Sequence, residues 1–214
     1  MKRSILVLAV LTLLLSGVGQ AKAGIAVTFD DQFGQQLGNG PFTLGWQFQV
    51  NNNITVTQLG VFDDALNGLG QSHEVGIWDS LGNLLTSTTV GAGTSGTLIN
   101  QFRYANTAAA NLTAGETYTI GAVWLDGTDP MIFGNTTNFN TDPSITFLNS
   151  SFVNGGSLTD PIIPVGPDPA YFGPNFAFGA AAVPEPASMT LLGLGAFSLA
   201  GYGWRRRKAQ TVNT

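Results

Sequence analysis

The sequence of 214 residues has no cysteine, one histidine and only 10% charged residues. Without cysteine no disulfide can stabilise the chain, and thiol or redox chemistry at cysteine is excluded. Because His73 is the only histidine, a zinc site built from paired imidazoles is impossible, and His73-Glu74 lacks the second histidine of a zincin motif. A Ser-His-Asp triad would have to use His73, yet no G-x-S-x-G elbow occurs.

Basic residues are nearly absent from the middle of the chain. Arg103 is the only one between Lys22 and Arg205, whereas all thirteen acidic residues lie from Asp30 to Glu185. An acidic domain without a basic patch repels phosphate backbones and releases no counterions from them. Nucleic acid is therefore excluded as a partner.

Sustained helical periodicity is also missing from Gly24 onward, where short apolar or alternating runs stand between Gly, Asn, Asp and Pro. This pattern predicts an all-β domain over residues 24–179, an antiparallel β-sandwich of jelly-roll or immunoglobulin-like type. The predicted strands are Phe42–Val50, Ile54–Phe62, Glu74–Asp79, Leu84–Val90, Leu98–Tyr104, Thr117–Trp124, Met131–Phe133, Ser144–Leu148 and Tyr171–Phe178. The Pro-rich steps of residues 161–169 are expected to form extended loops.

Two local patterns support the sandwich. In the first strand Trp46, Phe48 and Val50 share one face, as expected of a half-buried strand. Tyr118 follows Gly115 by three residues, a spacing similar to the tyrosine corner of β-sandwiches, in which the phenol bonds to backbone upstream.

The tryptophans have two interpretations. Trp46, Trp78 and Trp124 could form a platform that stacks on sugars, with Asn and Gln bonding the hydroxyls. Their places among alternating apolar residues favour packing in the core instead. Tyr171 and Phe172 are equally good candidates for exposed aromatic side chains.

One loop offers oxygen ligands. Asp63, Asn67 and Glu74 match positions of a calcium-loop template, and Asp64 adds a carboxylate. Ala65 breaks the template and strands replace the expected helices, so a solvated hairpin loop is the other interpretation. The sequence otherwise implies no cofactor. Asp63-Asp64 is a poor glycosidase pair, because neighbouring strand residues point to opposite faces.

The first 23 residues have the pattern of a signal peptide. Lys2 and Arg3 precede an apolar run over residues 5–15, and Ala21-Lys22-Ala23 forms a small-residue cleavage site before Gly24. We expect the export machinery and signal peptidase to act on this segment.

The other end has three parts in order. Residues 180–188 form a spacer with Pro184, Glu185 and Pro186, residues 189–204 are apolar and glycine-bearing, and residues 205–214 form a basic tail. We predict a transmembrane helix over 189–204 that leaves the sandwich outside the cytoplasm. The stop-transfer residues are Arg205, Arg206, Arg207 and Lys208.

This arrangement resembles the PEP-CTERM sorting signal of bacteria that make exopolysaccharide. The resemblance implies recognition by a membrane exosortase, cleavage near Pro184-Glu185-Pro186, and delivery to the cell surface or extracellular matrix. Separately, Phe42 to Phe133 resembles a jelly-roll domain often carried by PEP-CTERM proteins, which has no assigned activity.

We therefore expect a non-enzymatic exported protein, anchored transiently in the membrane, then present at the cell surface or outside the cell and associated with exopolysaccharide or biofilm matrix. The alternatives are a Ca²⁺-dependent adhesion or carbohydrate-binding module and a secreted hydrolase. One histidine, no cysteine and no paired acids leave few ways to build the acid–base pair of a hydrolase.

Overall fold

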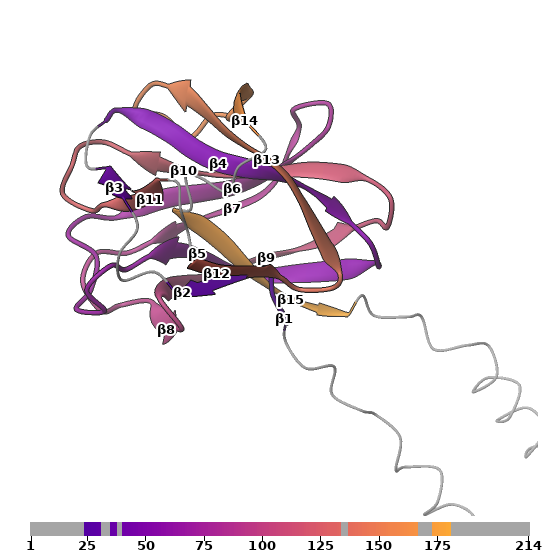
Figure 1. Cartoon of the computed structure of the whole chain (residues 1–214), viewed down its shortest axis with the longest axis horizontal. Coiled ribbons are helices and arrows are strands. Elements are labelled where there is room, and N and C mark those ends of the chain that lie inside the picture. The colour runs from indigo at the N-terminus through magenta and orange to yellow at the C-terminus, as the bar shows by residue number, and fades with distance from the viewer. Residues whose placement is uncertain (1–23, 31–34, 38–39, 134–136, 167–172, 181–214) are drawn as a thin grey trace, which may run out of the picture. The chain divides into compact units, whose positions relative to one another are not determined.

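The computed structural model describes residues 24–30, 35–37, 40–133, 137–166 and 173–180. Within these residues the regular elements are strands, and every pairing between them is antiparallel. Two larger sheets form the layers of a sandwich, with β4, β10 and β13 in one layer and β5, β9 and β15 in the other (Figure 1). The predicted all-β, antiparallel sandwich is confirmed.

The six-stranded sheet has the order β14-β13-β4-β10-β6-β7. Its strands are β14 (Ile163–Gly166), β13 (Ile145–Asn154), β4 (Phe42–Val50), β10 (Thr117–Trp124), β6 (His73–Asp79) and β7 (Leu84–Val90). The five-stranded sheet has the order β1-β15-β5-β9-β8. Its strands are β1 (Gly24–Ile25), β15 (Pro174–Ala180), β5 (Ile54–Phe62), β9 (Phe102–Leu112) and β8 (Thr97–Ile99). Two short ribbons pair β2 (Val27–Asp30) with β12 (Thr137–Thr141) and β3 (Gln35–Leu37) with β11 (Met131–Phe133).

Aromatic side chains join the two sheets through the core. Trp46 of β4 stacks on Phe176 of β15, with ring centroids 5.8 Å apart and planes 18° apart. Phe48, two residues further along β4, lies 4.9 Å from the same ring. Because Trp46, Phe48 and Val50 are all fully buried, the predicted inward face of this strand is confirmed.

Both sheets are also covered on part of their outer faces. On the five-stranded sheet, Phe29 of β2 packs against Phe62 and Phe102 at centroid distances of 5.8 and 5.5 Å. On the six-stranded sheet, Gly121 lies beneath Pro161, where an added Cβ would stand 2.9 Å from the proline ring. The absence of a side chain at Gly121 therefore lets the segment before β14 lie close to the sheet.

A seam of threonine hydroxyls joins the two layers where β7 meets β9. The hydroxyls of Thr86 and Thr107 lie 2.6 Å apart, and Thr86 also donates to the Ala108 carbonyl at 2.8 Å. Thr88 donates to the Asn106 carbonyl at 3.0 Å. Side chains thus satisfy backbone acceptors that would otherwise be exposed on a strand edge.

Several predictions are confirmed at the level of single elements. The strands Phe42–Val50, Ile54–Phe62, Leu84–Val90, Thr117–Trp124 and Met131–Phe133 have the predicted bounds. The tyrosine corner is present, because the Thr113 amide donates to the Tyr118 hydroxyl at 2.9 Å.

The prediction of one continuous strand over Leu98–Tyr104 is wrong. These residues form a hairpin, in which Ile99 of β8 pairs with Phe102 of β9 and Asn100-Gln101 is the loop. Asn100 has a φ of 55°, a left-handed conformation that asparagine tolerates well. The expectation of loops over residues 161–169 is also wrong in part, because β14 occupies Ile163–Gly166, and the strand predicted at Ser144–Leu148 continues to Asn154.

The core interpretation of the tryptophans is confirmed. Trp46 and Trp124 are 0% exposed and Trp78 is 4% exposed, so the alternative of a sugar-stacking platform is wrong.

Several predictions concern residues that the structure does not describe. They are the signal peptide, the aromatic side chains of Tyr171 and Phe172, the motif Pro184-Glu185-Pro186, the helix over 189–204 and the tail from Arg205 to Lys208. In the part of the chain that the structure describes, no helix is long and apolar enough to cross a membrane.

Candidate functional site

Several ionisable side chains of the domain lie in or against two connections, residues 63–72 between β5 and β6 and residues 125–130 between β10 and β11. A cavity of about 260 Å³ lies between them. Its lining consists of Asp63, Asp64, Ala65, Asn67, Gly68, Gly70, Thr128, Asp129 and Pro130. This cavity is the first candidate for a binding site.

Arg103 holds the first half of the longer connection. Its Nε donates to Asp63 Oδ2 at 2.7 Å, and the two side chains are only 7% and 2% exposed. A second guanidinium nitrogen donates to the Leu66 carbonyl at 3.1 Å, and the Gly68 amide donates to Asp63 Oδ2 at 3.0 Å. We call this group, Arg103 with Asp63, Leu66 and Gly68, the Arg103 clamp.

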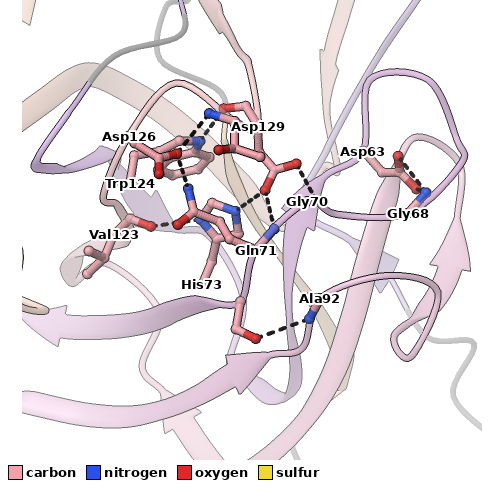
Figure 2. A network of polar contacts seen from close by, with 12 residues as sticks. Asp63, Gly68, Gly70, Gln71, His73, Ala92, Val123, Trp124, Asp126 and Asp129 are labelled. Atoms are coloured by element: carbon pink, nitrogen blue, oxygen red, sulfur yellow. Dashed lines mark hydrogen bonds and ion pairs between the residues drawn. The ribbon is translucent and has the colours of Figure 1, made fainter.

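His73 and Asp129 hold the second half (Figure 2). The His73 ring lies between two acceptors, with Nε2 at 2.9 Å from Asp129 Oδ2 and Nδ1 at 2.7 Å from the Val123 carbonyl. Asp129 also accepts from the amides of Gly70 and Gln71 at 2.7 and 2.9 Å. We call this group, His73 with Asp129, Val123, Gly70 and Gln71, the His73 clamp.

The His73 clamp joins the imidazole to a backbone carbonyl and to a carboxyl group, whose oxygens accept hydrogen bonds from ring N–H groups. Burial raises the pKa of Asp129, but the hydrogen bonds from His73 and from the Gly70 and Gln71 amides together lower it by more than burial raises it. The net pKa of Asp129 therefore lies below the ordinary value of 3.8. Asp129 is therefore a carboxylate at neutral pH.

Neighbouring contacts complete the clamp. The Trp124 indole donates to the backbone carbonyl of Asp129 at 2.9 Å and its ring lies 4.8 Å from that of His73. Gln71 donates to Asp126 Oδ1 at 3.0 Å, which ties the two connections together at the surface (Figure 2).

The predicted calcium ligands are only partly brought together. Asp63, Asp64 and Asn67 line the cavity, whereas Glu74 is not in its lining and is exposed on β6. Asp63 already neutralises Arg103 and accepts from Gly68, so its carboxylate has little charge left to offer a cation. Among the described residues, no group of three or more His, Cys, Asp or Glu side chains is placed to hold a metal ion.

Within the two clamps the ionisable side chains bond to one another and to the backbone. His73 is 0% exposed and both of its ring nitrogens are engaged inside the domain. Ser72, the nearest hydroxyl in sequence, accepts from the Ala92 amide at 3.1 Å. The buried charges hold loops in place.

A second cavity, of about 300 Å³, lies by the threonine seam and has a different character. Its lining is uncharged and consists of Gln58, Thr89, Gly91, Ser95, Gly96, Thr97, Tyr104, Ala105 and Asn106. Gln58 of β5 donates to Asn106 Oδ1 of β9 at 2.9 Å, which aligns two amides along one wall. We call this the amide-hydroxyl cavity.

Sequence reasoning missed Arg103 and Asp129 as partners. A signal was present, because a single arginine and a single histidine in an acidic domain with a large apolar core are more easily explained by burial against carboxylates than by exposure. Nothing in the sequence pointed to the amide-hydroxyl cavity, whose residues come from four segments of the chain: position 58 and residues 89–91, 95–97 and 104–106.

Comparison with known proteins gives two matches. A family model described as the PEP-CTERM protein-sorting motif matches residues 182–208, and one described as a domain of unknown function, DUF4082, matches residues 31–155. The first covers Pro184-Glu185-Pro186 and the arginine run, and the second covers the sandwich from the ribbon strand β3 through β13. No curated protein and no solved structure matches the chain significantly.

Proposed function

We propose that this chain, which belongs to the DUF4082 family and carries a PEP-CTERM protein-sorting motif, is a non-enzymatic protein of the cell surface or extracellular matrix. The motif makes exosortase its processing partner. In this proposal the mature protein associates with exopolysaccharide. The sorting motif is the observation that carries the proposal. Export through the signal peptide over residues 1–23 and removal of the anchor at Pro184-Glu185-Pro186 are part of it.

The state of the ionisable residues supports a role without catalysis. Asp63, Arg103, His73 and Asp129 all hold loops through buried bonds. An acid–base pair that turns over substrate needs at least one member in contact with that substrate.

The amide-hydroxyl cavity supports contact with polysaccharide. Sugars present many hydroxyls, and amide and hydroxyl side chains bond them without the desolvation cost of a charge. Gln58, Asn106 and Thr97 supply such groups at one place on the domain. The cavity is therefore where we place the glycan contact.

The first experiment measures binding of the exported chain to exopolysaccharide purified from the producing cells and to a glycan array, with Ca²⁺ and with chelator. Thr97→Arg puts a long side chain into the cavity from an exposed position on β8, and we expect it to abolish binding. Ser80→Arg is the matched control, because it adds the same charge at an exposed turn residue outside the cavity lining.

Each outcome has a meaning. Binding that is lost in Thr97→Arg and kept in Ser80→Arg supports the proposal. Binding lost equally in both variants overturns the placement in the cavity, and no binding by the unmodified chain overturns the polysaccharide role. Binding that disappears in chelator would favour the Ca²⁺-dependent module instead.

Sorting is tested separately. Replacing Pro184, Glu185 and Pro186 together by alanine is expected to leave the protein in the membrane fraction at its uncleaved mass. Release of this variant at the same mass as the unmodified protein would contradict exosortase processing at the motif.

A further inference from the structure

The start and the end of the sandwich lie beside each other. In the five-stranded sheet Gly24 of β1 pairs with Phe178 of β15, and Ile25 pairs with Ala177. Figure 1 shows β1 and β15 together at one edge of the sandwich. The chain therefore enters the domain at Gly24, opposite a residue that lies two positions before Ala180, the last residue of β15. From Ala180 the chain continues to the sorting motif.

Gly24 is closely packed on one side and faces a carboxylate. A Cβ added there would stand 2.7 Å from Phe178 Cζ and 3.1 Å from Asp142 Oδ2. The first distance is shorter than real Cβ atoms adopt, so glycine is needed where this strand begins. The second places a carboxyl oxygen of Asp142 near the Gly24 Cα, to which the Gly24 nitrogen is bonded.

Asp142 is fixed in the turn between β12 and β13. Its Oδ1 accepts from the Ser144 amide at 2.8 Å, and its own amide donates to the Ala26 carbonyl at 3.0 Å. No described residue donates to Oδ2, the oxygen that faces Gly24. The carboxylate is thus oriented by the turn with one oxygen left for another donor.

There is room for that donor. A cavity of about 420 Å³ adjoins the site and is lined by Gly24, Ile25, Thr28, Asn100, Asn140, Asp142 and Pro143. Asn100 and Asn140, whose side chains each carry an amide oxygen able to accept a hydrogen bond, belong to this lining, and no basic residue does.

The sequence predicts signal peptidase cleavage between Ala23 and Gly24. Hydrolysis of this peptide bond consumes one water and leaves a carboxylate on Ala23 and an amine on Gly24, which takes up a proton near neutral pH. We propose that this new ammonium pairs with Asp142 Oδ2, so that removal of the signal peptide itself completes the edge of the sandwich from which the sorting segment continues. This inference rests on the export step of the proposed function.

The pair would link maturation at one end of the chain to stability at the other. Before cleavage the Gly24 nitrogen is a neutral amide with one proton, whereas after cleavage it carries a positive charge and three protons. The ammonium would fasten β1 to the turn at Asp142, and β1 in turn pairs with β15 at Phe178 and Ala177. The exported form is therefore expected to hold β15 more firmly than the precursor does.

A favourable composition makes the test selective. Lysines occur only at positions 2, 22 and 208, so after cleavage the Gly24 amine is the only primary amine between residues 24 and 207. Mass spectrometry of the exported protein first identifies the N-terminal residue. An amine-reactive ester then labels the protein at neutral pH, folded and in urea, and the peptide that begins at Gly24 is quantified.

We expect labelling of Gly24 in the folded protein to be at least about fivefold slower than in urea, because an opposite charge within ~4–6 Å of an amine favours its protonated, unreactive form. Asp142→Asn removes the charge while its side-chain oxygen still accepts from Ser144, and it should bring the folded rate to within about twofold of the urea rate. Asp142→Ser does the same with a hydroxyl, should the first variant not fold. Glu74→Gln, which removes an exposed carboxylate on the other sheet, should leave labelling slow.

The outcomes separate this inference from the proposed export. An N-terminus other than Gly24 overturns the predicted cleavage and the pair with it. An N-terminal Gly24 whose labelling is as fast folded as in urea, or equally slow in Asp142→Asn and Asp142→Ser, leaves export standing and overturns the pair. Slow labelling that is relieved by both Asp142 variants and unchanged by Glu74→Gln supports it.

Discussion

The two clamps hold opposite halves of the same connection and differ in how they do it. The Arg103 clamp uses a guanidinium that stays charged at every accessible pH and reaches both a carboxylate and a carbonyl in residues 63–66. The His73 clamp uses an imidazole and a carboxylate, and the pKa of that carboxylate lies below its ordinary value. Its carboxylate bonds the backbone of the connection directly.

The two clamps are similarly buried, yet the stability lost on removing one member is expected to differ between them. Removing the central cation from the first clamp leaves a nearly buried carboxylate with one remaining backbone donor. In the second, His73 and Asp129 each have other partners in the structure, so loss of one member is partly compensated. The variants below compare the clamps, from the largest expected effect to the smallest.

Arg103→Leu should have the largest effect. It leaves the Asp63 carboxylate buried and unpaired, which lowers the free energy of unfolding by about 3–5 kcal/mol. Denaturant unfolding of the exported protein measures this. The double variant Asp63→Asn with Arg103→Leu should recover part of the loss, and no recovery would mean that the ion pair is not the source of the effect.

Asp129→Ala should have a smaller effect, about 2–3 kcal/mol, because it removes a charged acceptor from the Gly70 and Gln71 amides and from His73. The same unfolding measurement applies. Asp126→Ala is the control, since that carboxylate is exposed and accepts from the Gln71 side chain and the Thr128 amide at the surface. An equal loss in both variants would contradict the special role of the buried residue.

Acid should weaken the His73 clamp selectively. Because the folded-state pKa of Asp129 lies below 3.8, the unfolded chain binds a proton at higher pH than the folded chain does. The contribution of Asp129 is therefore fully present above pH ~4 and is lost as pH falls through its lowered pKa. The stability difference between the unmodified protein and Asp129→Asn should shrink over that window, and a difference independent of pH would refute the assignment.

Calcium should have the smallest effect. Since Asp63 is engaged by Arg103 and Glu74 lies outside the cavity lining, millimolar Ca²⁺ or chelator should leave the melting temperature unchanged. A rise in melting temperature with Ca²⁺ that is abolished in Asp64→Asn would show that the cavity binds the ion despite the clamp.

Alternation within single segments made much of the fold predictable. Phe42–Val50 and Thr117–Trp124 could be assigned because each repeats apolar residues every second position, a feature complete within nine residues or fewer. The tyrosine corner is equally local, because its donor and acceptor are five positions apart in the chain. The hairpin at Asn100 was missed because apolar residues flank it on both sides and no glycine marks the turn.

The candidate site was less predictable because its bonds join distant residues. Asp63 and Arg103 are 40 positions apart, and His73 and Asp129 are 56 apart. The calcium template grouped Asp63 with Glu74 by spacing along the chain. In the folded domain the strand that begins at His73 carries Glu74 to an exposed face, and Arg103 arrives beside Asp63 from β9.

The sequence alone determined the all-β class, the alternating core strands and the PEP-CTERM sorting segment, because each depends on residue types at short, regular spacings. The tertiary structure decided which carboxylates are neutralised, where an uncharged cavity opens and that Gly24 meets Phe178 and Asp142. These depend on strand order and register, which bring together residues that no local pattern relates.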